Sequence, residues 1–261
     1  MSWWKRLWNR QTVEPPLADE VLPKEWPRLL GQHVPFYRRF LPAQRAALAQ
    51  QVQTFLDEKE FWGSQDLEVT PEMKVVVAAY ACLLVLKRPD LGLFPRTREV
   101  ILYPSEFGEI IEAIGPDGRR YKIDLSKIGE TWRGGPVLLA WDSVGGPYSE
   151  NDNGHNTVLH EFAHALDYLD GAADGAPPLK TDEERATWKR VMTDEYQSLV
   201  AADQRGRRTF FDPYGAKNPA EFFAVVTEHF FEQPQRFRRN HRALYALLES
   251  FFNQDPASWR R

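Results

Sequence analysis

The stretch NTVLHEFAHALDYLD, residues 156–170, contains two histidines four positions apart, with a glutamate directly after the first. On an α-helix, residues at positions i and i+4 lie on one face about one turn apart. His160 and His164 can therefore direct two imidazole nitrogens at one ion, while Glu161 can reach a water molecule bound to that ion. The pattern predicts a metal site with two ligands and a general base from a single helical turn.

The residues around this motif favour a buried helix. Asn156 or Thr157 can cap its N-terminus, and most of the remaining positions are apolar. Random placement would produce the motif in roughly one protein per hundred of this size and composition. The alternative interpretation is that both histidines lie on the surface of an ordinary amphipathic helix.

A catalytic zinc site needs a third protein ligand and leaves one position open for water. The residues alone leave three candidates for that ligand. Asp170 follows the second histidine of the motif by six residues. For Asp170 to reach the same ion, the chain would have to turn back after His164, which needs glycine at position 167. Asp167 occupies that position, so we expect the helix to continue and carry Asp170 away from the ion. The other candidates lie on a later predicted helix, NPAEFFAVVTEHFFEQP at residues 218–234.

On that later helix the candidates are Glu228 with its neighbour His229, and Glu221 near the N-terminus. Glu221 could simply close a capping box with Asn218. A glutamate on a second helix, 57 residues beyond His164, is also the arrangement expected of gluzincin-type peptidases. The helix N-terminus would keep this carboxylate ionised and ready to bind a cation.

Composition indicates a folded protein with a sizeable core. The chain has 261 residues, 43% of them hydrophobic, and a formal net charge of −4, so its charge does not predict direct nucleic-acid binding. The single cysteine, Cys82, excludes an internal disulfide and indicates a reducing cytoplasm. The longest apolar run, residues 75–86, is shorter than the ~20 residues that span a bilayer. We expect a cytoplasmic protein without a membrane span.

Strand-like and helical segments are separated along the chain. We expect residues 1–65 to form an N-terminal tail and helical extension, irregular over 11–36, and residues 66–261 to form the main domain of one compact unit. The predicted strands are 98–104, 110–125 with a hairpin turn at 115–118, and 135–144; the predicted helices are 42–59, 71–87 and several after 155. Strands followed by helices predict an α+β fold, with a small, mostly antiparallel sheet.

Several segments resemble the Mlc titration factor A family of zinc-dependent peptidases, which is similar in turn to the catalytic domain of anthrax lethal factor. The resemblance is carried by VLHEFAHALD (158–167) and YGAKNPAEFFAVVTEHFF (214–231), and it extends to TPEMKVVVAAYACLLVL (70–86), REVILYPSEF (98–107) and VLLAWDSV (137–144). It covers about residues 30–255. It implies a zincin-like metallopeptidase fold for residues 66–261, with C-terminal helices following the active-site helix.

The resemblance also implies a set of site residues. One zinc ion per chain would be held by His160, His164 and Glu221, with Glu161 as general base. Tyr214, seven residues before Glu221, would donate a hydrogen bond to the transition state. The implied activity is hydrolysis of peptide or protein substrates. Aminopeptidase-like action is one form of this activity, and the sequence does not distinguish it from endopeptidase action.

A second class of function remains open. The family name implies titration of the transcriptional repressor Mlc, so the chain could be a regulatory protein that sequesters such a repressor, with the zinc site secondary. Two smaller hypotheses concern individual segments. Asp167, three positions after His164, could orient a ligand histidine, and residues 137–144 could be the sheet edge along which an extended substrate adds. His155 has no motif partner and is treated as incidental.

Overall fold

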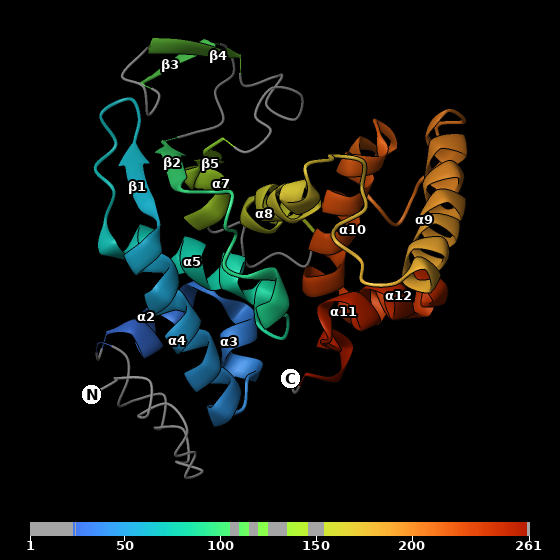
Figure 1. Ribbon diagram of the computed structural model, residues 1–261, viewed down its shortest axis with the longest axis horizontal. Coiled ribbons are helices and arrows are strands. Elements are labelled where there is room, and N and C mark those ends of the chain that lie inside the picture. The colour runs from blue at the N-terminus through green and yellow to red at the C-terminus, as the bar shows by residue number, and fades with distance from the viewer. Residues whose placement is uncertain are drawn as a thin grey trace, which may run out of the picture.

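The computed structural model describes residue 23 and residues 25–104, 110–114, 120–124, 135–145 and 154–259. Residues 1–22, which include most of the predicted tail, and the predicted turn at 115–118 lie outside this description. The described helices are α2 (Trp26–His33), α3 (Pro35–Arg39), α4 (Pro42–Glu58), α5 (Pro71–Val85), α7 (Trp141–Gly145), α8 (Thr157–Asp167), α9 (Asp182–Asp203), α10 (Pro219–Glu232), α11 (Pro234–Asn240) and α12 (Arg242–Phe252) (Figure 1). The described strands are β1 (Glu60–Gly63), β2 (Glu99–Tyr103), β3 (Ile110–Ile114), β4 (Arg120–Asp124) and β5 (Val137–Ala140).

Helices α5 and α9 begin at residues whose side chains cap a helix N-terminus. Thr70 accepts a hydrogen bond from the backbone N–H of Met73 at the start of α5 (3.3 Å), and Thr181 and Glu184 form a capping box at the start of α9. The predicted helix at 42–59 is confirmed as α4. The prediction of an irregular lead-in is wrong from Trp26 onward, because α2 and α3 form there. Each carries proline in its first turn, where the missing N–H costs no helical hydrogen bond.

The predicted antiparallel sheet is wrong for the main sheet. Strands β1, β2 and β5 form a three-stranded sheet in the order β1-β2-β5, and both pairs are parallel. Among the described strands, only β3 and β4 pair antiparallel, as a separate two-stranded sheet. The apolar runs EVILY and VLLA are typical of parallel strands covered on both faces, where alternation is lost. Strand β1 was missed, and the second half of the predicted strand at 135–144 is the short helix α7.

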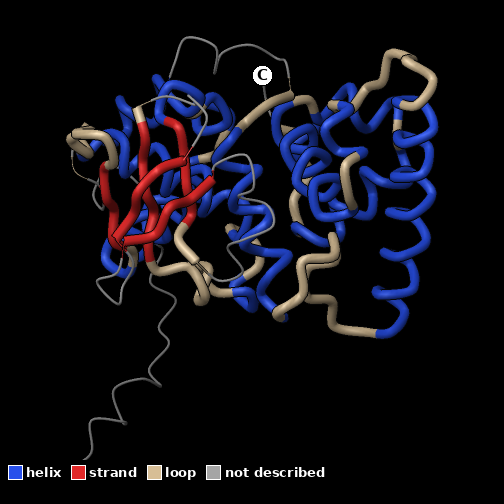
Figure 2. Tube along the Cα trace, turned by 90° about the horizontal axis from the view of Figure 1, so that it is seen from above, coloured by secondary structure: helices blue, strands red, loops and turns tan. Residues whose placement is uncertain are grey.

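Helix α8 lies in the middle of the molecule, between the sheet and helices α9–α12 (Figure 1). It packs against α10, α5 and β5, and its apolar side chains belong to one continuous cluster of buried residues that runs from Trp26 to Phe252. Figure 2 shows the strands gathered at one side of the molecule, with helices filling the remainder. The α+β class is therefore confirmed. None of the described helices is long and apolar enough to cross a membrane.

Candidate metal centre

Helix α8 orients the motif residues by burying its other side. Asn156 caps the helix and accepts a hydrogen bond from the backbone N–H of Leu159 (3.0 Å). Leu159 and Phe162 are fully buried, whereas the side chains of His160 and His164 are 14% and 22% exposed. The two imidazoles therefore lie on the one edge of the helix that the hydrophobic core leaves accessible, as the spacing of the motif predicts.

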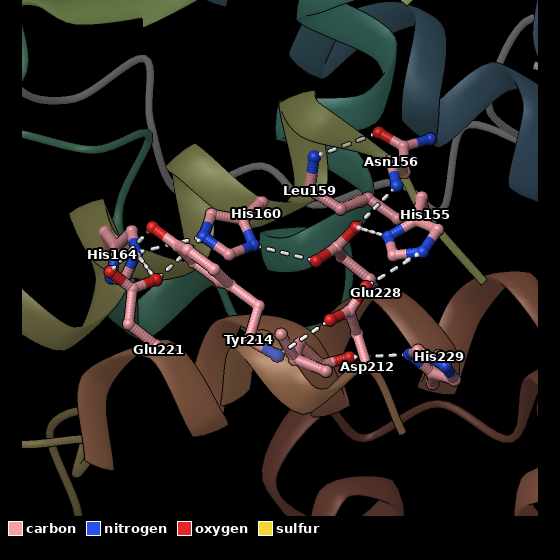
Figure 3. A network of polar contacts seen from close by, with 11 residues as sticks. His155, Asn156, Leu159, His160, His164, Asp212, Tyr214, Glu221, Glu228 and His229 are labelled. Carbon is pink, nitrogen blue, oxygen red and sulfur yellow. Dashed lines mark hydrogen bonds and ion pairs between the residues drawn. The ribbon is translucent and has the colours of Figure 1, made fainter. Parts of the chain in front are cut away.

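Glu221 approaches the two histidines from α10. Asn218 accepts a hydrogen bond from the backbone N–H of Glu221 (2.9 Å), which starts α10 at this point. The carboxylate itself, 2% exposed, turns toward α8 (Figure 3). Its Oε2 lies 3.1 Å from Nε2 of His160 and 3.2 Å from Nε2 of His164, and the two Nε2 atoms are 3.2 Å apart. Among the described residues, these three have ligand atoms close enough together to hold a metal ion.

The donor chemistry of this cluster fits a cation. Nδ1 of His160 donates a hydrogen bond to Oε1 of Glu228 (2.7 Å), so its Nε2 carries a lone pair when the ring is neutral. That lone pair faces Oε2 of Glu221, which is also an acceptor. Two acceptors at this distance repel each other unless a positive charge lies between them. A proton or a metal ion can supply that charge.

The pKa values of the two carboxyl groups at the site, Glu221 and Glu161, also depend on positive charge at the histidines. Burial alone would raise the pKa of Glu221, but hydrogen bonds with His160 and His164 outweigh it and hold the pKa of this carboxyl well below its usual range. Burial raises the pKa of Glu161, against the opposing charges of the same two histidines. The cluster thus combines an ionised carboxylate with a second carboxyl group that binds protons more readily.

Tyr214 reaches the cluster from a short 3-10 helix at Pro213–Ala216. Asp212 caps that helix by accepting a hydrogen bond from the backbone N–H of Tyr214 (2.7 Å). The Tyr214 hydroxyl donates to Oε1 of Glu221 (3.3 Å), while the residue remains 51% exposed. Burial and the charge of Glu221 raise the pKa of Tyr214 to about 12, so the hydroxyl keeps its proton at neutral pH. The structure therefore brings all five predicted site residues to one region.

The alternative third ligands lie elsewhere. Helix α8 ends at Asp167 instead of continuing, and the following turn leaves Asp170 exposed, accepting a hydrogen bond from the backbone N–H of Ala172 (2.9 Å). His229 is buried, and its Nδ1 contacts the backbone oxygen of Val225 (2.9 Å). Glu228 contacts the far nitrogen of the His160 ring, away from the cluster.

Two further contacts were not predicted from the sequence. Asp167, for which the sequence suggested a role in orienting a ligand histidine, accepts a hydrogen bond from the backbone N–H of Gly175 (2.9 Å) and so holds the loop that follows α8. His155, treated as incidental, lies 3.1 Å from Oδ2 of Asp212, the residue that caps the helix of Tyr214. The only signal for the second contact is the presence of a histidine immediately before the cap of α8.

Comparison with known proteins places the chain in the class of metallopeptidases, because residues 4–253 match a family of such enzymes. The chain belongs to the family described as glucose-regulated metallo-peptidase M90. Membership of a metallopeptidase family implies a metal, and the cluster of two histidines and a glutamate could bind one.

Named relatives cover nearly the whole chain. An uncharacterized protein of Synechocystis is 39% identical over 249 residues, which are 93% of this chain and 88% of the relative. Mlc titration factor A of Klebsiella pneumoniae strain 342 is 31% identical over 242 residues, 91% of this chain and 89% of the relative. Mlc titration factor A of Escherichia fergusonii is 29% identical over 85% of this chain and 84% of the relative. These relatives confirm the resemblance to the Mlc titration factor A family.

Proposed function

We propose that this protein hydrolyses peptide bonds with one zinc ion held by His160, His164 and Glu221. The observation that carries the proposal is the spacing of the three ligand atoms, whose mutual distances are 3.1, 3.2 and 3.2 Å. Two ligands of a tetrahedral zinc site lie about 3.3 Å apart when each is ~2.0–2.1 Å from the ion. Two imidazoles and one carboxylate are also a donor set that catalytic zinc sites use, with one position left for water.

Glu161 is the proposed general base. A zinc ion bound to the cluster would polarise the scissile carbonyl group and lower the pKa of a water molecule. Glu161, next to His160 on α8, accepts the proton of the attacking water and then returns it to the leaving amine. Burial raises the pKa of Glu161, which makes this carboxylate a better proton acceptor than an exposed glutamate would be.

Tyr214 is the proposed hydrogen-bond donor to the negative charge that develops on the carbonyl oxygen. Its hydroxyl contacts Glu221 at the cluster, and half of the residue is exposed, so a substrate can approach it from solvent. Its raised pKa keeps the donor protonated while negative charge forms nearby. In this role the tyrosine acts on the transition state and is not needed to hold the metal.

The proposed substrate is an extended peptide or protein segment that adds along β5. This strand pairs with β2 on one side, and no other described strand pairs with it. Helix α8 packs directly against β5, so a peptide paired with the other side of this strand would pass close to the motif. Recognition through backbone hydrogen bonds would tolerate many side chains. We assign the activity to the cytoplasm, where the single, buried Cys82 would stay reduced.

Glu161→Gln tests the peptidase proposal. The amide cannot accept a proton from water, so we expect peptide hydrolysis to fall at least ~100-fold with an unchanged zinc content. Asp170→Asn is the matched control, because it neutralises an exposed carboxylate just beyond the same helix; its turnover should equal that of the wild type. Turnover of a fluorogenic peptide library and metal analysis of the same preparations provide the measurements. Hydrolysis that survives in zinc-loaded Glu161→Gln contradicts the proposal.

Binding of a transcriptional repressor related to Mlc is a second proposed function. It is supported by the relatives named Mlc titration factor A, which match about nine-tenths of the chain. Titration calorimetry with a purified repressor of this type should give equal affinities for the wild type and Glu161→Gln, because binding needs no proton transfer. Absence of binding to both proteins would exclude this function and leave the peptidase proposal unaffected.

A further inference from the structure

Glu228 is a buried carboxylate that the proposed reaction does not use. It lies on α10 seven positions after Glu221, about two turns along the same side of the helix. Only 4% of the residue is exposed. Burying an ionised carboxylate is costly unless hydrogen-bond donors surround it, so its partners indicate why the residue is there.

Both oxygens of Glu228 accept hydrogen bonds from α8 or its cap (Figure 3). Oε1 accepts from Nδ1 of His160 at 2.7 Å. Oε2 accepts from the backbone N–H of Asn156, the N-cap of α8, at 2.5 Å. One rigid group on α10 therefore fixes both the start of α8 and the imidazole ring of the first motif histidine.

This geometry determines which nitrogen of His160 faces the cluster. Because a carboxylate only accepts, the ring nitrogen beside Glu228 must carry the proton. Nε2 is then free to donate its lone pair toward His164 and Glu221. A hydrogen bond from a carboxylate to the far nitrogen of a ligand histidine also restrains the ring orientation and makes the ligand more basic.

We propose that Glu228 is a positioning residue that holds His160 in the tautomer and orientation required for zinc binding. The inference rests on the proposed function, since it assumes that His160 is a zinc ligand. A purely structural role, linking α10 to the start of α8, is the competing explanation. The two differ in their effect on zinc affinity and on the Nδ1 proton of His160.

Glu228→Gln separates these roles, because glutamine offers one acceptor oxygen where two donors must be satisfied. The matched control is Glu232→Gln, one turn further along α10. Glu232 accepts a hydrogen bond from the side-chain amide of Asn156 (2.8 Å), and glutamine can still accept that bond. Both variants remove one negative charge from the α10 side that faces the start of α8.

Zinc affinity, measured by competition with a chelator, is the main readout. We expect Glu228→Gln to bind zinc about 10- to 100-fold more weakly and Glu232→Gln to match the wild type. In zinc-loaded wild type, the Nδ1 proton of His160 should exchange slowly with water by NMR, and this protection should be lost in Glu228→Gln. Thermal unfolding of the metal-free proteins shows whether each variant is folded.

The outcomes separate the inference from its premise. Unchanged zinc affinity in a folded Glu228→Gln overturns the inference and leaves the proposed peptidase intact. If the wild type binds no zinc, the inference and the proposed function are both overturned. The same holds if His160→Ala binds zinc as tightly as the wild type. If Glu228→Gln does not fold, the wild-type NMR measurement decides alone: a slowly exchanging Nδ1 proton supports the inference, and a rapidly exchanging one contradicts it.

Discussion

Helices α8 and α10 build the site in different ways. Both begin with an asparagine cap, Asn156 and Asn218. The chemistry of α8 lies within five consecutive residues and follows from helical geometry alone. The two buried acids of α10, Glu221 and Glu228, lie seven positions apart in a helix that is buried along almost its whole length. Their function depends on packing against a helix far away in the sequence, so only the first contribution can be recognised locally.

Removing a ligand from either helix should have the largest effect. We expect Glu221→Ala and His164→Ala to lose zinc affinity equally, each by more than the 10- to 100-fold typical of an outer hydrogen-bond partner. Metal analysis after dialysis against a chelator measures the loss. Glu228→Gln, with its smaller expected loss, is the reference. Full retention of zinc by Glu221→Ala would mean that Glu221 is not a ligand and would return the role to Asp170, Glu228 or His229.

Tyr214→Phe should affect turnover without affecting the metal. The hydroxyl contacts Oε1 of Glu221, whereas Oε2 faces the histidines, so both helices keep their ligands in this variant. Loss of one donor to a developing oxyanion typically costs 100- to 1,000-fold in kcat, or about 3–4 kcal/mol. Steady-state kinetics on a peptide with parallel zinc analysis provides the check. A rise in KM at constant kcat would assign Tyr214 to substrate binding instead.

The difference between the two helices explains what the sequence could predict of the site. His160, Glu161 and His164 follow from spacing, and capping preference narrows the N-cap of α8 to Asn156 or Thr157. Glu221 stayed one of three candidates until the family resemblance selected it, because no local rule places α10 beside α8. The partner of His160 was equally non-local, although a pair of acids in the apolar run AEFFAVVTEHFF already indicates buried carboxylates.

The fold shows the same division. The long helices were predicted closely because caps and prolines mark their ends within a few residues. The parallel pairing of the main sheet was not predicted, because strand pairing depends on the connections between strands and on packing against both faces of the sheet. Strand β1 has the sequence EFWG, too short to show a period. Helix α7 follows β5 without a break, so its residues were absorbed into the predicted strand.

Buried acids give the next contrast, because the carboxylates of α10 are satisfied and that of Asp167 on α8 is not. Oδ2 of Asp167 accepts from Gly175, but Oδ1 finds no hydrogen-bond partner among the described residues. Burial raises the pKa of Asp167 to about 6. A carboxyl group with a native pKa above its unfolded value of ~4 destabilises the fold as it ionises, so stability falls between about pH 4 and pH 6 and stays lowered above.

Asp167→Asn should therefore stabilise the protein at pH 7.5, by about 1–3 kcal/mol, provided that the amide oxygen keeps the bond to Gly175. At pH 5 the gain should be smaller, since the wild-type carboxyl is then mostly protonated. Urea unfolding of both proteins at the two pH values, at the same zinc concentration, measures the difference. A gain that is larger at pH 5 than at pH 7.5 would contradict the assignment.

The smallest expected effects concern the two capping residues, Asn156 of α8 and Asn218 of α10. They test whether the cap of α8 contributes more to stability because it also bonds to the other helix. Asn218→Ala removes one hydrogen bond, to the N–H of Glu221, and should cost about 1 kcal/mol of unfolding free energy. Asn156→Ala removes its cap bond and also the side-chain bond to Glu232, and should cost about 2 kcal/mol.

Serine at each position keeps a cap oxygen but is too short to reach Glu232. Urea unfolding should therefore show nearly full recovery for Asn218→Ser and only partial recovery for Asn156→Ser. Equal recovery at both positions would mean that the Asn156–Glu232 bond contributes nothing to the free energy of unfolding.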